Sequence, residues 1–123
     1  MKILATYLPQ YHQIPINDEA WGEGFTDWDN VRKCKKRFRE HYQPHVPADN
    51  DYYNPKNYRT RKKQCDLAHN YGIDGFILYH YWFEGDRIMD QVVDGFLDDE
   101  KSKLKHVVCW ANESWSRNWD GQE

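Results

Sequence analysis

Three apolar runs along the chain have the pattern of buried β-strands. They cover residues 3–8, 75–83 and 104–110. None shows the alternation of polar and apolar residues that marks a half-buried strand, and strands of parallel sheets covered on both faces read as continuous apolar runs. Pro9 ends the first run, because proline has no backbone N–H to donate to a neighbouring strand. The pattern therefore predicts three strands of a parallel sheet.

The segment between the first and second runs ends in a predicted helix over residues 56–71. Asn54 is expected to cap this helix and Pro55 to occupy its first turn, where proline is favoured. Gly72 stands where a left-handed residue usually closes a helix. The apolar stripe of this predicted helix consists of Tyr58, Cys65, Ala68 and Tyr71, with Leu67 alongside.

A second helix is predicted between the second and third runs, at about residues 87–98. Six apolar residues recur there at helical spacing, which is typical of an amphipathic helix. They are Ile88, Met89, Val92, Val93, Phe96 and Leu97.

The predicted order is strand, long loop, helix, strand, helix, strand, which gives two β-α-β units sharing one strand. Residues 10–55 form the long loop region, with a short helix expected near residues 27–36. A closed barrel of eight strand-helix units needs at least about 200 residues. We therefore expect residues 1–123 to be a single partial domain, an α/β structure forming the N-terminal part of a (β/α)8 TIM-type barrel.

The composition of the chain argues against several classes of protein and of binding partner. Aromatic residues make up 16% of the chain, which excludes a disordered segment, and the net charge of -3 gives no bulk attraction to nucleic acid. No apolar stretch approaches the roughly 20 residues of a membrane span, and no secretion signal precedes the first strand, so a cytoplasmic location is expected. The three separated cysteines and the proline between His41 and His45 argue against a disulfide framework or a metal site. No cofactor is expected.

Polar and aromatic side chains gather at the carboxyl end of each expected strand. Such ends meet at one rim of a parallel sheet, where the chemistry of α/β folds is found. One cluster alone is more typical of packing, but three at successive strand ends favour a carbohydrate site with aromatic platforms and hydroxyl-binding groups. The candidate substrate-binding residues in these clusters are Tyr7, Gln10, His12, Tyr79, His80, Trp82, Trp110, Asn112 and Trp115.

Glu113 is the candidate catalytic residue, because it follows the third strand between two tryptophans. A partly desolvated carboxyl group has a raised pKa, as a general acid requires. The alternative is a structural ion pair between Glu113 and Arg117 that holds the loop in shape.

Six segments of the chain together resemble the WbsX-type glycosyltransferases, which are similar to family-99 glycoside hydrolases, the endo-α-mannosidase group. Those segments are residues 7–12, 21–28, 41–45, 71–76, 79–83 and 110–115. The resemblance adds Trp28 to the candidate substrate-binding residues. One departure lies beside it, since the family usually has glutamate where this chain has Asp27.

The resemblance implies a barrel with a sugar site at its carboxyl rim and a role in bacterial surface polysaccharide (O-antigen or lipopolysaccharide) biosynthesis. Glycosyl transfer and glycoside hydrolysis both remain open. The paired carboxylates of the hydrolase relatives are expected further along than residue 123, so this chain alone is expected to be inactive. A truncated piece, or a noncatalytic sugar-binding piece, is the alternative. Self-association through the open sheet is also expected.

Overall fold

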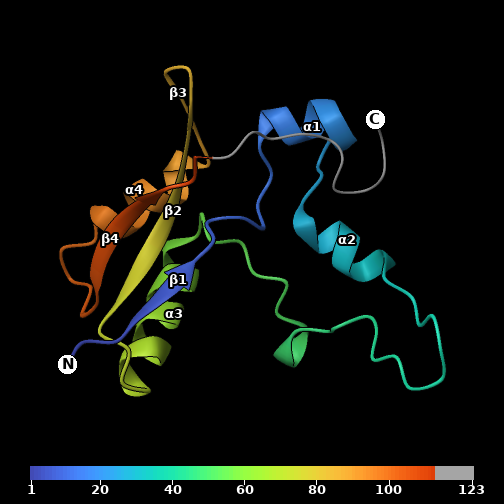
Figure 1. Cartoon of the computed structure of the whole chain (residues 1–123), viewed down its shortest axis with the longest axis horizontal. Coiled ribbons are helices and arrows are strands. Elements are labelled where there is room, and N and C mark those ends of the chain that lie inside the picture. The colour runs from blue at the N-terminus through green and yellow to red at the C-terminus, as the bar shows by residue number, and fades with distance from the viewer. Residues whose placement is uncertain (113–123) are drawn as a thin grey trace.

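The strand β2 lies at the centre of the sheet and pairs with each of the other strands (Figure 1). The structure is a computed structural model that describes residues 1–112. The strands β1 (Leu4–Tyr7) and β4 (Lys105–Trp110) pair with opposite edges of β2 (Gly75–Phe83), both in parallel. All three predicted strands are therefore confirmed as parallel neighbours, with their carboxyl ends on one side.

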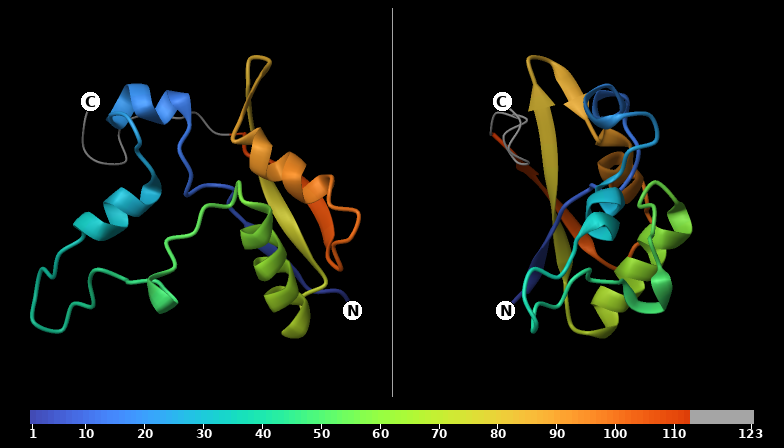
Figure 2. Two further views of the ribbon diagram at one scale, coloured as in Figure 1. Left: turned by 180° about the vertical axis from the view of Figure 1, so that it is seen from behind. Right: turned by 90° about the vertical axis from the view of Figure 1, so that its right-hand side faces the viewer.

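Two helices cover one face of this sheet, and the other face is bare except at its carboxyl end, where Ile14 and Met89 pack with Tyr81 (Figure 2). They are α3 (Tyr58–Asn70) and α4 (Asp90–Leu97), close to the predicted ranges. The main core lies between these helices and the sheet. Its buried members are Cys65, Phe76, Leu78, Val92, Val93, Phe96 and Leu104. This α/β arrangement is compatible with the N-terminal part of a TIM-like barrel.

The ends of α3 follow local backbone chemistry. The prediction that Asn54 caps this helix is wrong. The side chain of Asn57 caps it, accepting a hydrogen bond from the backbone N–H of Arg59 at 2.9 Å, whereas the side chain of Asn54 accepts one from the backbone N–H of Lys56, before the helix begins. At the other end Gly72 adopts φ 83° and closes the helix as predicted. The stripe is only partly correct, because Tyr71 is 82% exposed whereas Cys65 is buried.

A fourth strand, β3 (Asp86–Ile88), corrects the prediction of three strands and of a helix starting at residue 87. It pairs antiparallel with the end of β2, with Ile88 opposite Tyr81. The connection is Glu84-Gly85, both with positive φ, as in a two-residue hairpin turn of type I′. Ile88 and Met89 fit a helical period by spacing alone, but this turn places them before the helix.

The segment of residues 10–55 contains more regular structure than predicted. The short helix α2 (Asp27–Lys33) lies where a helix was expected, with Thr26 and Asp29 forming its capping box. A second helix, α1 (Pro15–Trp21), and a 3-10 turn, η1 (Ala48–Asn50), were not predicted. Pro15 in the first turn of α1 was the available signal, since proline favours that position.

The bare face and the outer edges of the sheet expose apolar side chains. Leu4 and Val107 point to the face opposite the helices. Val108 lies on the edge strand β4, and Ile3 directly precedes the edge strand β1. Each of the four side chains is between 41% and 49% exposed. In a closed barrel these surfaces would be covered by further strands and helices. Within residues 1–112 nothing covers them.

Because of this bare face, we predict that the 123-residue chain self-associates in solution. Replacing Leu4 and Val107 together by lysine is expected to shift the chain toward monomer, since neither side chain belongs to the buried core. Sedimentation velocity over a range of concentrations measures this. The control is Asn70→Lys at the exposed end of α3. A parent chain that stays monomeric at every concentration and unfolds cooperatively would contradict the prediction.

Candidate functional site

A hydrogen bond joins the carboxyl ends of β1 and β2. The side-chain amide of Gln10, three residues after β1, donates to the phenol oxygen of Tyr81 at 3.1 Å. Tyr79 and Ala111, the latter just after β4, pack against the cluster that contains Tyr81. Residues from all three parallel strand ends therefore meet at this place, which we call the Gln10–Tyr81 rim.

Strand alternation sets which side of the sheet each rim residue faces. Phe76 and Leu78 of β2 face the helices, so Tyr79 and Tyr81 face the opposite side. That side corresponds to the interior of a barrel. Tyr81 was not among the predicted site residues, although the rule that flagged Tyr79 applies equally to it. Tyr81 is buried, so it acts by positioning Gln10.

Three further candidates form a separate aromatic group on the helix-facing side of the same end. His80 and Trp110 are paired in register on β2 and β4. The His80 and Trp82 rings lie 6.4 Å apart, and the Trp110 indole N–H donates to the Trp82 carbonyl at 3.4 Å. Trp82 is 51% and Trp110 59% exposed, so both present ring surface to solvent.

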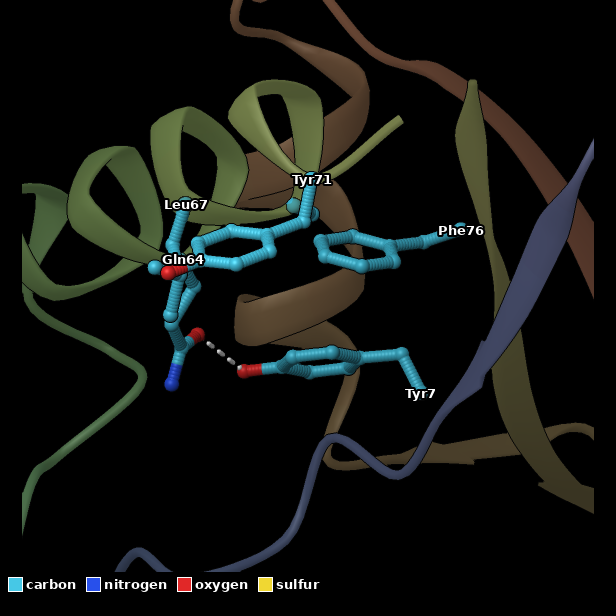
Figure 3. Close-up of a pocket in the computed structure, with 6 residues that line it drawn as sticks. Tyr7, Gln64, Leu67, Tyr71 and Phe76 are labelled. Carbon is cyan, nitrogen blue, oxygen red and sulfur yellow. Dashed lines mark hydrogen bonds between the residues drawn. The ribbon is translucent and has the colours of Figure 1, made fainter. Parts of the chain in front are cut away.

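Tyr7 points from β1 toward α3, beside Phe76 (Figure 3). Its hydroxyl donates to the side-chain oxygen of Gln64 on α3 at 2.8 Å, and its ring packs against Phe76 and Phe96 at centroid distances of 5.2 and 4.9 Å. Burial raises the pKa of this phenol well above its usual range. These contacts are those of a residue that joins β1 to the helices. A groove with a volume of about 600 Å³ lies beside Tyr7. Leu67 of α3 and Tyr71, the residue after α3, border it (Figure 3).

Trp28 is held in an aromatic cluster of the 10–55 segment. Its indole N–H donates to the Tyr53 carbonyl at 2.8 Å, and its ring contacts Tyr11 at 4.4 Å. Asp27, where the family usually has glutamate, accepts a bond from the Tyr11 backbone N–H at 3.3 Å. This carboxylate therefore helps to tie α2 to the segment that follows β1.

His12 occupies a different place, in a cavity between α1, β3 and the start of α4. The cavity has a volume of about 330 Å³. The His12 ring is only 2% exposed, and its Nδ1 lies 3.5 Å from the Gln10 carbonyl oxygen. Desolvation by burial lowers the pKa of the ring.

The remaining candidates follow β4. Asn112 is exposed, and its backbone N–H donates to the Trp110 carbonyl at 3.1 Å. Glu113 and Trp115 lie outside the described residues, so their positions stay predictions. In the part of the chain that the structure describes, no group of His, Cys, Asp and Glu side chains is arranged to hold a metal ion. No helix among these residues has the length and apolar character to cross a membrane.

Comparison with known proteins finds a matching family and a similar protein in two bacterial strains. The family model described as "Glycosyltransferase WbsX" matches residues 3–123. The protein called "Uncharacterized protein WxcX" from Xanthomonas campestris pv. campestris, in strains B100 and ATCC 33913, is 41% identical over 120 residues. That alignment covers 98% of this chain but only 17% of the relatives, so the chain spans about a sixth of their length. No solved structure matches the chain.

Proposed function

Since the chain belongs to the WbsX glycosyltransferase family, we propose that residues 1–123 contribute one part of a single barrel domain that acts on carbohydrate. The proposed reaction is transfer or hydrolysis of an α-linked glycoside during synthesis of a bacterial surface polysaccharide. The proposed substrate is a glycan, and no cofactor is required by the residues described here.

The observation that carries this proposal is the Gln10–Tyr81 hydrogen bond. It brings a primary amide to the barrel-interior side of the carboxyl rim, the edge where the loops of α/β barrels build their sites. An amide offers both a donor and an acceptor, so it suits the hydroxyl groups of a sugar. Tyr81 uses its oxygen to hold one amide hydrogen of Gln10, which leaves the amide oxygen for a ligand.

The other rim groups suit the same chemistry. Tyr79 supplies a partly exposed ring beside Gln10, and the exposed Asn112 supplies a second amide after β4. Trp82 and Trp110 lie on the other, helix-facing side of the same strand ends, so their exposed rings are proposed as a separate stacking surface for pyranose rings. Glu113 is the proposed acid/base or oxocarbenium-stabilising group.

The test is substitution of Gln10 in a full-length family member with this N-terminal segment. Gln10→Leu keeps the size of the side chain but loses both hydrogen-bonding groups, so kcat/KM on an α-linked mannoside or the native acceptor is expected to fall about tenfold, the cost of about 1.4 kcal/mol in a lost hydrogen bond. Asn70→Leu, which removes an exposed amide at the end of α3, is the control. Unchanged kcat/KM in Gln10→Leu would remove the rim from the substrate site. Sugar binding without turnover in the parent would instead favour a noncatalytic sugar-binding protein.

A further inference from the structure

The cavity around His12 lies beside the Gln10–Tyr81 rim but is built from different elements. We call it the His12 cavity. Its walls come from α1 and the residues before it, from Lys56, from β3 and from the first turn of α4. The two sites share one short segment, because the Gln10 side chain contacts Tyr81 while the Gln10 carbonyl contacts the His12 ring. The rim and the cavity are therefore neighbours along residues 10–12.

The His12 ring presents a hydrogen-bond acceptor to this cavity. Its Nδ1 faces a carbonyl oxygen, which fixes the hydrogen on Nδ1 and leaves Nε2 as the acceptor. No partner for Nε2 is found among residues 1–112. Burial, reinforced by the nearby Lys56 ammonium, lowers the pKa of His12 and outweighs the opposite influence of Gln10 and Asp27. The ring is therefore neutral at neutral pH, so its Nε2 can accept a hydrogen bond from a ligand in the cavity.

The rest of the wall divides into an apolar floor and a polar mouth. Ile14 and Met89 are buried and form one cluster with Tyr81, and Ile88 packs against them. Lys56, Asp86 and Asp90 line the same cavity. One ammonium and two carboxylates give the lining a net negative charge, which disfavours an anionic ligand.

We propose that the His12 cavity binds one monosaccharide unit, neutral or amino-substituted, of the glycan whose reacting end lies at the Gln10–Tyr81 rim. This inference rests on the proposed function for the identity of the ligand as a glycan. A volume of about 330 Å³ accommodates one sugar ring, at the small end of the range for ligand pockets. A ring hydroxyl donates to Nε2 of His12, the Lys56 ammonium and the two carboxylates bind other polar groups, and the apolar face of the ring packs on Ile14 and Met89.

The experiment measures sugar binding by saturation-transfer NMR on a full-length family member with these residues. The probes are D-mannose, D-glucosamine and D-glucuronic acid. Transfer to mannose or glucosamine is expected, with at least a several-fold weaker signal from glucuronic acid. No transfer to any of the three, or a stronger signal from glucuronic acid, overturns the inference.

Two variants locate the bound sugar. Ile16 lies on α1 at the cavity and is about half exposed, so Ile16→Trp fills the space without disturbing the core and is expected to remove the part of the transfer that comes from the cavity, leaving that from the rim. The control Leu67→Trp adds the same ring at an exposed position of α3, away from the cavity, and is expected to leave transfer unchanged. Transfer that is as strong in Ile16→Trp as in the parent overturns the inference.

Substitutions of His12 test the hydrogen bond itself. His12→Gln replaces the Nε2 acceptor with an amide group and is expected to retain part of the binding, whereas His12→Phe keeps the ring without an acceptor and is expected to lose it. Equal binding by both variants overturns the assigned role of Nε2. Binding that is lost in Ile16→Trp, in a protein that turns over no glycoside, supports the cavity and overturns the proposed function. Turnover of a glycoside by a protein that binds no sugar in the cavity supports the proposed function and overturns the inference about the cavity.

Discussion

Substitution of Gly75 by alanine is expected to lower the free energy of unfolding by about 3 kcal/mol, the upper end of the usual cost of overpacking a core. Gly75 begins β2 between the two parallel neighbours. A Cβ atom there would lie 2.2 Å from the Lys105 carbonyl oxygen and 3.0 Å from Leu4 Cδ2. The Lys105 oxygen belongs to the backbone of β4, so it cannot rotate away. The strand must shift, and its pairing with β4 weakens.

The matched control is Gly95→Ala in α4. A Cβ there would lie 2.5 Å from Arg61 Cζ, which is the end of a flexible side chain. Alanine also has a higher helix propensity than glycine, by about 1 kcal/mol, which offsets the rearrangement of Arg61. Urea unfolding at one protein concentration compares the two midpoints. A Gly75→Ala urea midpoint equal to that of the parent would show that the sheet accepts the Cβ atom without losing stability, and it would contradict the prediction.

The sheet was predictable because its signals are local and repeated. Continuous apolar runs at residues 75–83 and 104–110 mark strands that helices cover, and Gly72 marks the helix end before β2. These features concern each residue and its near neighbours along the chain. The parallel order then follows, because each helix returns the chain to the end of the sheet at which the preceding strand began.

The parts that sequence reasoning missed depend on backbone conformation or on contacts between distant residues. Glu84-Gly85 forms a tight hairpin although asparagine or aspartate is the usual first residue of such turns, so the helical period of Ile88 and Met89 outweighed it. The separation of Tyr7 from Trp82 and Trp110 depends on which neighbour each ring meets, here Gln64 for Tyr7. Spacing along the sequence does not contain that information.

The proposed catalytic role of Glu113 follows from its place in the chain. The strand β4 ends at Trp110, and Ala111 already packs at the rim with the Tyr81 cluster. Glu113 comes two residues further along the chain, and we propose that its carboxylate acts on a ligand held by Gln10. Family membership supports a carbohydrate substrate, for which a carboxyl group is the usual proton donor or charge-stabilising group.

Replacing Glu113 by glutamine in a full-length family member is expected to lower kcat by 10² to 10⁴-fold, since glutamine keeps the shape of the side chain but neither transfers a proton nor carries negative charge. Turnover of an α-linked mannoside or the native acceptor measures the effect. Glu100→Gln, an exposed residue in the turn after α4, is the control and is expected to retain parent activity. A role confined to an ion pair with Arg117 predicts a different result: lower stability, with kcat within a few-fold of the parent once the protein is folded. Comparing kcat with the unfolding midpoint of the same variant therefore separates proton transfer from support of the loop.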